Sequence, residues 1–523
     1  MATDVQIAVS KIASVNPATG EVLREMECTR EGEVIAAVAR ARAAQPAWFE
    51  IGVRKRTAVL REFQRRLSEK KTEIAEAITR EAGKPVAEAL TTEILVVLDA
   101  ARFLIDNAHR LLSDEAVPHG NLATKLKKGR LVREPYGVVG IISPWNYPFS
   151  IPATEALAAL VAGNAVVLKP SEFTSLTALE LQRLLHVAGV PRDIFQVVVG
   201  DGATGGALIQ SQIDKLIFTG SVPTGKRIAA AAAQRLLPVV LELGGKDPML
   251  VLDDADVDVA SSAAVWGAFV NAGQACLSVE RCYVHRSLYA DFLKACAEKT
   301  KKLRIGPGTD SETDVGPMIH ERQLRIVEAQ VEDALARGAR VLAGGTRLPE
   351  LGPNFYMPTV LADVTHGMRI MREETFGPVL PVMAFDSDEE AVRLANDSEY
   401  GLAASVWTRD PKRGEALARH IHAGTVMVND VLSCFGISEA PHGGVKSSGV
   451  GRAHGRFGLD EMVRLKYLDT DRMPGMKKVW WYGYGAGFAK QMEGFLDFQF
   501  AGNWGTRLRG IIRANGLVRT KKL

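Results

Sequence analysis

The sequence contains few cysteines, and no two of them have the spacing of a metal-binding or redox motif. The five residues are odd in number and widely separated, without a Cys-x-x-Cys pair: Cys28, Cys276, Cys282, Cys296 and Cys434. This arrangement argues against both a disulfide framework and a zinc site. We therefore expect no bound metal, and a reducing, cytoplasmic environment.

The chain also lacks a long apolar run and a strong excess of charge. No uninterrupted apolar stretch reaches the length of a membrane span, and the first residues lack the basic and apolar regions of a secretory signal. The net charge of +3 gives no case for nucleic acid binding. Hydrophobic and charged contents of 47% and 24% are ordinary for a globular protein. Because a chain of 523 residues is too long to fold around one hydrophobic core, we expect at least two domains.

The order of apolar segments predicts an α/β fold. Residues 31–44, 54–81 and 86–112 follow the helical period, and residues 121–141 alternate like a β-ribbon. Strand-like runs then alternate with helical stretches, which is the rhythm of a parallel sheet. The expected strands are 138–142, 165–169, 194–199, 214–218 and 238–241, and a second α/β set covers 246–440.

Cys276 has the surroundings of a nucleophile. It lies in the segment Asn271-Ala272-Gly273-Gln274-Ala275-Cys276-Leu277-Ser278, after an apolar run over residues 263–270. Small neighbours let a substrate approach the sulfur, and a thiolate there attacks a carbonyl carbon if a nearby group deprotonates it. On this segment alone, a buried cysteine that acts as a small hydrophobic residue is an equal alternative.

Three other stretches favour the chemical interpretation. Glu242 follows an apolar run and stands between two leucines, so burial should raise its pKa toward that of a general base. Asn146 lies between Pro144 and Pro148, which fix the backbone and hold its amide as a donor to an oxyanion. The acidic and aromatic turn at 373–378 is the third stretch. Each alone fits a turn or a helix cap equally well.

Together these motifs resemble the aldehyde dehydrogenase superfamily. The resemblance covers residues from about 14 to 470. Within that range, further motifs in the family's order are residues 166–172, 218–221, 424–429 and 447–452. It implies a Rossmann-like cofactor domain, an α/β catalytic domain and a small β oligomerisation ribbon. The expected boundaries are 1–116 and 134–244 for the cofactor domain, 245–445 for the catalytic domain, 117–133 and 455–470 for the ribbon, and 471–523 for a C-terminal arm.

The resemblance also implies catalytic roles. Cys276 would attack the aldehyde carbon, and Asn146 with the Cys276 backbone N–H would hold the oxyanion. After hydride transfer to the nicotinamide, Glu242 would activate water to hydrolyse the thioester. Family members that transfer the acyl group to coenzyme A typically lack that glutamate, so Glu242 favours hydrolysis; coenzyme A acylation is the runner-up. A non-catalytic scaffold would be free to lose these three residues.

A cofactor fingerprint appears in an unexpected place. Residues 200–205 match Gly-x-Gly-x-x-Gly after a strand, yet the resemblance assigns the pyrophosphate to the next helix, at Ser221. Lys169, which we also count among the catalytic residues, and Glu172 would bind the adenosine ribose. Glu172 would repel a 2′-phosphate, so we expect NAD in preference to NADP, with NADP possible because of Lys169. The expected cofactor-binding residues are Ser143, Trp145, Lys169, Glu172, Gly202, Phe218, Gly220, Ser221, Gly225, Leu243, Glu374 and Phe376.

Several positions depart from the family pattern. Ala453 and His454 follow Gly451-Arg452, where many members have a glutamate that relays protons, and Thr154 stands where many have a tryptophan. We expect a widened substrate channel lined by Phe149, Thr154 and Phe435. The wider resemblance is to bacterial succinate-semialdehyde dehydrogenase-like members. The loop 432–439 contains no Arg or Lys, which argues against recognition of a substrate carboxylate.

Residues 471–523 lie beyond the usual end of the family. They contain nine aromatic residues and ten Lys or Arg against three Asp or Glu. Two interpretations are open: an arm docked on a neighbouring subunit of a homo-oligomer, either dimer or tetramer, or a basic and aromatic contact with a membrane surface. We favour the arm, because the aromatic residues lack a sustained helical period.

Overall fold

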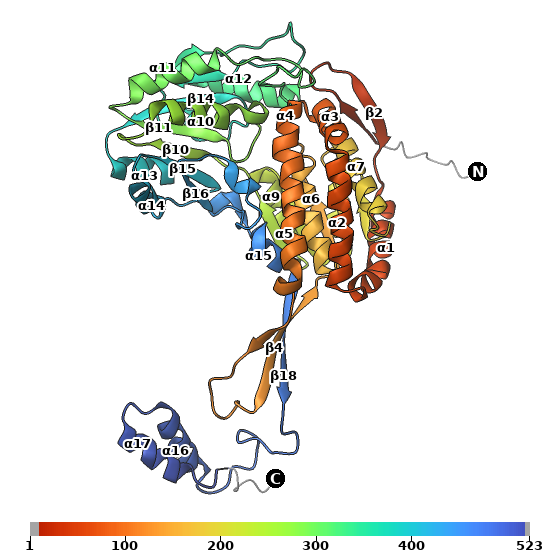
Figure 1. The fold of residues 1–523 in the computed structure, drawn as a ribbon, viewed down its shortest axis with the longest axis vertical. Coiled ribbons are helices and arrows are strands. Elements are labelled where there is room, and N and C mark those ends of the chain that lie inside the picture. Colours follow the sequence, from red (N-terminus) through yellow and green to blue (C-terminus); the bar gives the residue numbers. More distant parts are fainter. Residues whose placement is uncertain (1–9, 518–523) are drawn as a thin grey trace, which may run out of the picture. The chain divides into compact units, whose positions relative to one another are not determined.

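The computed structural model describes residues 10–517. The described chain divides into two compact units, one formed by residues 10–111 and 135–463 and the other by residues 112–134 and 464–517. The first unit contains two sheets with their covering helices and a short antiparallel pair, β1 (Lys11–Val15) with β2 (Val22–Glu27). The expected α/β fold with parallel sheets and a small antiparallel sheet is confirmed (Figure 1).

The first sheet has six strands and is the expected Rossmann-like element. Its central strands are buried because helices cover both faces, so continuous apolar runs form them. Every pairing is parallel except that of β17 with β9. The strand order is β17 (Gly449–Val450), β9 (Val239–Glu242), β8 (Lys215–Thr219), β5 (Val138–Ile142), β6 (Ala165–Lys169) and β7 (Phe195–Val197).

The chain order reverses at β5, which pairs with β6 on one side and β8 on the other. Ligands bind at the carboxyl ends of the strands beside such a reversal. The helices that follow these strands therefore begin at the candidate site. They are α6 (Ser150–Ala162), α7 (Ser175–Val187), α8 (Gly202–Gln210) and α9 (Val222–Ala233).

The second sheet has seven strands and carries the Cys276 segment. It is parallel except at one edge, where β12 and β13 are antiparallel. Its order is β12 (Arg340–Ala343), β13 (Thr359–Ala362), β14 (Val379–Phe385), β11 (Val279–His285), β10 (Asp247–Val251), β15 (Ala403–Trp407) and β16 (Thr425–Val428). The helices of this part are α10 (Val257–Phe269), α11 (Tyr289–Thr300), α12 (Glu321–Ala336), α13 (Asp388–Asn396) and α14 (Pro411–Ala418).

The N-terminal helices differ in detail from the sequence expectation. Helix α1 (Glu31–Glu50) continues through Pro46, beyond the expected end. The stretch 54–81 divides at Lys70, whose φ of −102° and ψ of 12° leave the helical region, into α2 (Val53–Glu69) and α3 (Lys71–Ala82). The third helix begins as α4 (Val86–Glu88), widens into a π-helical turn over Ala89–Ile94 and continues as α5 (Leu95–Leu111).

The second unit contains a three-stranded sheet and a helical hairpin. The strands are β3 (Glu115–Val117), β4 (Lys127–Pro135) and β18 (Val463–Asp471), and β18 follows the short helix α15 (Gly455–Asp460) of the first unit. The strand expected from residue 121 is wrong at its start, since residues 121–126 form a turn closed by side-chain and backbone bonds to Asn121.

The C-terminal tail contains two helices, α16 (Phe488–Phe500) and α17 (Trp504–Ala514). The sequence analysis, which considered only the period of the aromatic residues, did not predict these two helices. Small residues let the helices pack closely: a Cβ added at Gly510 would lie 2.6 Å from the Gly494 carbonyl oxygen. Residues 518–523 lie outside the described part of the chain.

Candidate active site

Cys276 follows a left-handed turn at the end of α10. Asn271 and Ala272 have φ values of 53° and 55°, an unfavourable conformation for residues with a Cβ. The Asn271 side chain stabilises the turn, since its Nδ2 donates to the Gln274 carbonyl oxygen at 3.1 Å and to the Asn146 carbonyl oxygen at 2.9 Å. Strain of this kind is found where a side chain must be presented to a ligand, here Cys276.

Three hollows of the first unit meet at Cys276. The largest is an open cleft of about 1140 Å³ along the carboxyl ends of the first sheet. The second is a pocket of about 210 Å³, and the third is an inner cavity of about 20 Å³ that also contains Glu242. Cys276 therefore lies where the cleft, the apolar pocket and the inner cavity with the Glu242 carboxyl group meet.

Asn146 lies in the loop between β5 and α6. It is 4% exposed, and its Nδ2 donates to the Gln274 carbonyl oxygen at 3.1 Å, which leaves its second N–H free to bind a ligand in the cleft. Its backbone carbonyl accepts from Lys84 Nζ at 2.7 Å. The amide is thus fixed through both its side chain and its backbone, as an oxyanion donor must be.

Glu242 is the last residue of β9, where Gly449 of the edge strand β17 lies opposite it. It is 5% exposed, and neither carboxyl oxygen has a hydrogen-bond partner among residues 10–517. Burial raises the Glu242 pKa well above its usual range, and the nearby Glu155 raises it further, while Arg452 opposes them. A buried carboxyl group without partners is suited to accept a proton from water.

The Cys276 thiol is not activated by its own surroundings. Burial raises the Cys276 pKa well above its ordinary value, and the charges of Asp247 and Glu374 add to this effect. The thiol therefore needs a base. Glu242, which shares the inner cavity, is a candidate.

The cleft gathers eleven of the twelve residues expected to bind the cofactor. They are Ser143, Trp145, Lys169, Glu172, Gly202, Phe218, Gly220, Ser221, Leu243, Glu374 and Phe376. Gly225 does not line the cleft, because it faces Leu243, whose Cδ2 would lie 2.5 Å from an added Cβ. Gly225 thus serves the packing of α9.

The geometry at the start of α9 suits a pyrophosphate. Ser221 is the N-cap, and no side chain caps the free N–H groups of the first turn. Its hydroxyl donates to Thr224 Oγ1 at 3.1 Å, on the exposed wall of the cleft. Free amides at a helix start bind anions. Of the fingerprint at 200–205, Gly202 and Gly205 line the wall of the cleft.

Lys169 and Glu172, the two residues expected to bind the adenosine ribose, form an ion pair at one end of the cleft. The distance between Lys169 Nζ and Glu172 Oε2 is 3.6 Å. Burial lowers the Lys169 pKa, and Glu172 opposes this shift. At the other end, Trp145 and Phe376 pack edge to face with centroids 5.3 Å apart. Glu374 accepts from the Gly245 N–H at 3.1 Å, and burial raises its pKa to about 8.

The apolar pocket contains one of the three residues expected to line a substrate channel. Phe435 lines it, but Phe149 is fully buried and donates its backbone N–H to Glu93 Oε2 at 3.1 Å. Thr154 lines the inner cavity instead, and its hydroxyl bonds the Ile151 carbonyl oxygen. The lining contains no charged residue: Thr91, Thr92, Val96, Tyr147, Ile151, Trp266, Val270, Ala275, Cys276, Leu277, Leu432, Ser433, Phe435 and Gly436.

The sequence analysis missed His442 and Glu155, two polar residues behind Glu242, and named His454 only as a departure from the family pattern. The His442 Nε2 lies 3.8 Å from Glu242 Oε2, and His442 and His454 have ring centroids 5.9 Å apart. Glu155 also lines the inner cavity, and burial raises its pKa to about 8. The departure at His454 was the available signal, since a polar residue in an apolar setting needs a reason.

Comparisons with known proteins agree with this geometry. A model of the aldehyde dehydrogenase family matches residues 5–468. The chain is 42% identical over 490 residues to the 4,4'-diapolycopene aldehyde oxidase of Methylomonas sp, covering 94% of this chain and 91% of that protein. It is 41% identical over 456 residues to the putative succinate-semialdehyde dehydrogenase [NADP(+)] of Mycolicibacterium smegmatis, covering 87% and 88%.

Solved structures are similarly close. An NAD-dependent aldehyde dehydrogenase from Sinorhizobium meliloti has a TM-score of 0.86 at 37% identity, covering 90% of this chain and 93% of that one. An NAD+ complex of an aldehyde dehydrogenase from Bacillus cereus has a TM-score of 0.85 at 36% identity, covering 88% and 94%. The chain belongs to the aldehyde dehydrogenase family and oxidises aldehydes to carboxylic acids with NAD or NADP.

Proposed function

We propose that the enzyme oxidises an apolar aldehyde to the free carboxylic acid through a covalent adduct on Cys276. The observation that carries this proposal is the position of Cys276, which lines the cofactor cleft, the uncharged pocket and the cavity of Glu242 together. An aldehyde in the pocket can therefore meet the sulfur on one side while a hydride acceptor lies on the other.

In the first half of the reaction, Cys276 Sγ attacks the aldehyde carbon after its proton passes to a base. The Asn146 amide, which is fixed by its bond to Gln274 and by Lys84, and the Cys276 backbone N–H stabilise the oxyanion that forms. NAD(P) bound in the cleft supplies the hydride acceptor. Loss of the hydride from the adduct leaves a thioester on Cys276.

In the second half, Glu242 takes a proton from water as the water oxygen attacks the thioester carbon. The carbon–sulfur bond breaks, the carboxylic acid leaves and Cys276 is restored. The raised pKa makes the Glu242 carboxylate a stronger base than an exposed glutamate. Glu242 supports hydrolysis over transfer to coenzyme A, and product analysis with and without coenzyme A distinguishes the two reactions.

The substrate should be apolar because the pocket offers no charged partner. A carboxylate such as that of succinate semialdehyde would lose its hydration there without an Arg or Lys to replace it. The names of the two relatives above contain two types of aldehyde, 4,4'-diapolycopene aldehyde and succinate semialdehyde. The pocket favours the first type.

For the cofactor, we propose NAD in preference to NADP. Glu172 at the ribose end of the cleft would accept hydrogen bonds from two ribose hydroxyls and repel a 2′-phosphate. Lys169 Nζ, 3.6 Å from Glu172 Oε2, reduces that repulsion. The ratio of kcat/KM with the two cofactors tests this proposal, and Glu172→Gln should move the ratio toward NADP.

A homo-oligomer, dimer or tetramer, would cover the exposed strand β18, on which Leu465 and Tyr467 are 61% and 46% exposed. We propose a cytoplasmic location from the cysteine pattern. No helix in residues 10–517 is long and apolar enough to cross a membrane.

An aldehyde panel scored by NADH absorbance tests the substrate proposal. We expect kcat/KM to rise with alkyl or polyene length from acetaldehyde upward, and to be at least tenfold lower for succinate semialdehyde than for an uncharged aldehyde of equal length. Preference for the semialdehyde would contradict an apolar substrate without affecting the family assignment.

A further inference from the structure

The α16–α17 hairpin presents an apolar face that nothing in the described chain covers. On α17, Trp504, Leu508, Ile511 and Ile512 are 77%, 59%, 48% and 76% exposed. Their spacing of four, seven and eight residues places them on one stripe of the helix. The opposite side is occupied, because Gly510 is buried against α16. The hairpin therefore buries Gly494 and Gly510 between its helices and exposes the large apolar side chains of α17.

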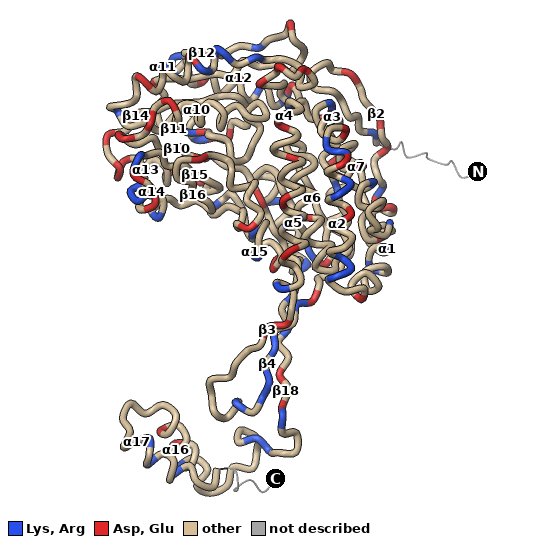
Figure 2. Tube along the Cα trace, viewed as in Figure 1, with Lys and Arg blue, Asp and Glu red and all other residues tan. Residues whose placement is uncertain are grey.

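Basic residues accompany this face. Arg507 and Arg509 lie between the exposed apolar positions of α17, and Figure 2 shows Lys and Arg along the hairpin and along β4 and β18. The whole segment 471–523 has ten Lys or Arg and three Asp or Glu. A monomeric soluble protein seldom exposes so many large apolar residues together without a partner.

We propose that the α16–α17 hairpin binds the surface of an anionic lipid bilayer. The helices of 13 and 11 residues are too short to span a bilayer, which needs about 20 residues, but they suit its interface. Exposed Trp480 and Tyr482, outside the helices, are of the residue types enriched at that interface. Arginines beside the apolar stripe attract acidic headgroups.

The test is sedimentation of the full-length enzyme with vesicles of phosphatidylcholine alone or with about 30 mol% phosphatidylglycerol, whose negative surface potential attracts basic segments. We expect binding to the acidic vesicles only. Trp504→Ser with Ile512→Ser should abolish it, and Arg509→Glu should weaken it at least tenfold. Leu335→Ser, an equally drastic change at a 43% exposed leucine of α12, is the matched control.

Light scattering decides between lipid and a second copy of the chain. The double variant should keep the oligomer of the wild-type enzyme and its activity on a water-soluble aldehyde. If the oligomer dissociates, or if the wild-type enzyme does not sediment with acidic vesicles, the lipid proposal is wrong and the face belongs to a subunit contact.

A second and independent inference concerns the buried groups behind Glu242. After each hydrolysis Glu242 holds a proton that must leave. It has no hydrogen-bond partner in the described chain, and neither ring nitrogen of the buried His454 has one. Two small cavities adjoin these groups, of about 20 Å³ and 30 Å³, each large enough for a water molecule, which needs about 10–15 Å³.

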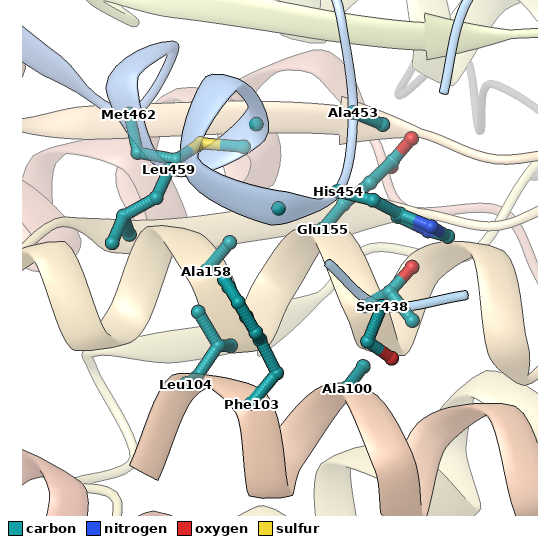
Figure 3. Close-up of a pocket in the computed structure, with 13 residues that line it drawn as sticks. Ala100, Phe103, Leu104, Glu155, Ala158, Ser438, Ala453, His454, Leu459 and Met462 are labelled. Carbon is teal, nitrogen blue, oxygen red and sulfur yellow. The ribbon is translucent and has the colours of Figure 1, made fainter. Parts of the chain in front are cut away.

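The two cavities have shared walls. The larger one, of about 30 Å³, is the outer cavity. Both cavities are lined by Thr154, Glu155, Ala453 and His454. Figure 3 shows Glu155, His454 and Ser438 gathered on one side of the outer cavity, with apolar side chains such as Phe103 and Leu459 on the other. Glu155 and His454 line both cavities and Glu242 lines the inner one, so these polar groups connect the cavity of Glu242 to the outer cavity, whose wall includes the half-buried Phe103.

We infer that His442 and His454 relay the proton from Glu242 toward solvent, an inference that rests on the proposed role of Glu242. His442 Nε2 lies 3.8 Å from Glu242 Oε2, and both residues line the inner cavity, which has room for a water molecule. A neutral imidazole accepts a proton on one nitrogen and releases one from the other, so no net charge remains. Burial keeps both rings neutral by lowering their pKa values, to about 3 and about 4.

Pre-steady-state kinetics test the relay. In His442→Phe and His454→Leu the NADH burst should persist, the steady-state rate should fall at least tenfold, and added imidazole should restore part of it. The control is His285→Phe. The His285 ring lies outside the site and packs on Phe385, with 5.5 Å between the ring centroids, so this variant should behave as wild type.

An unchanged steady state in both variants overturns the relay and leaves the proposed function intact. Loss of the burst, or a slow rate that imidazole does not restore, means that the histidines serve acylation or packing instead. If Glu242→Gln hydrolyses the thioester normally, the proposed function itself is wrong.

Discussion

The Lys84 ammonium group and the Glu93 carboxylate form a fully buried ion pair, 2.7 Å apart, directly behind the loop between β5 and α6 that contains Asn146. Lys84 also donates to the Asn146 carbonyl oxygen, and Glu93 accepts from the N–H groups of Phe149 and Ser150. The pair therefore fixes both ends of the segment that contains Asn146. Its charges are compensated by hydrogen bonds, which burial requires.

Lys84→Met should destabilise the protein by about 3–5 kcal/mol, because it leaves the Glu93 charge buried without a partner. It should also slow the NADH burst, since Asn146 loses a fixed backbone. Thermal unfolding and stopped-flow absorbance measure the two effects. Lys84→Met with Glu93→Gln should recover part of the melting temperature; equal values for the single and double variants would argue against the pair.

Cys276→Ala should abolish aldehyde oxidation while the cofactor still binds, because the nucleophile is lost and the cleft is unchanged. Activity is measured by NADH absorbance and binding by calorimetry. The matched control is Cys282→Ala, a fully buried cysteine of β11, which should retain activity. More than a few per cent of residual activity in Cys276→Ala would place the nucleophile elsewhere.

Glu242→Gln should separate the two halves of the reaction. With a group other than Glu242 as the base for the Cys276 thiol, a rapid NADH burst should remain, followed by a steady state slower by about 10²–10⁴-fold, the usual contribution of a general base. Stopped-flow absorbance records both phases. Joint loss of burst and steady state would show that Glu242 instead forms the thiolate.

The buried Glu155 makes stability depend on pH. Burial raises its pKa from the ordinary 4.5 to about 8, so the folded protein holds a proton that the unfolded chain releases. This contribution is complete below pH 4.5 and is lost as the pH rises through about 8. Glu155→Gln should therefore flatten the fall in melting temperature between pH 5 and 9, measured by calorimetry. An unchanged slope would mean that Glu155 is ionised in the fold.

Ser433→Arg should change the preferred substrate, because it adds a cation to the uncharged pocket. We expect KM for an apolar aldehyde to rise at least tenfold and kcat/KM for succinate semialdehyde to improve. Ser433→Gln, long but neutral, separates charge from size. If both variants behave alike, the pocket discriminates by shape.

The sequence by itself determined the order of elements and nominated the candidate reacting groups. Apolar runs alternating with helical stretches specify buried parallel strands, because nothing else accommodates so many apolar side chains on both faces. Cys276, Glu242 and Asn146 stood out because small residues, leucines and prolines beside them are costly unless a site needs them. Local chemistry of this kind can be inferred from the neighbouring residues in the sequence.

Only the tertiary structure decided what lies behind and around those groups. His442 reaches Glu242 across 200 positions of sequence, Phe149 turns away from the channel, and Trp266 of α10 lines it. The amphipathic face of the tail appeared once α16 and α17 packed through their glycines. These relationships depend on which surfaces meet when the sheets and helices pack, and that choice is set by the whole chain at once, so no local pattern records it.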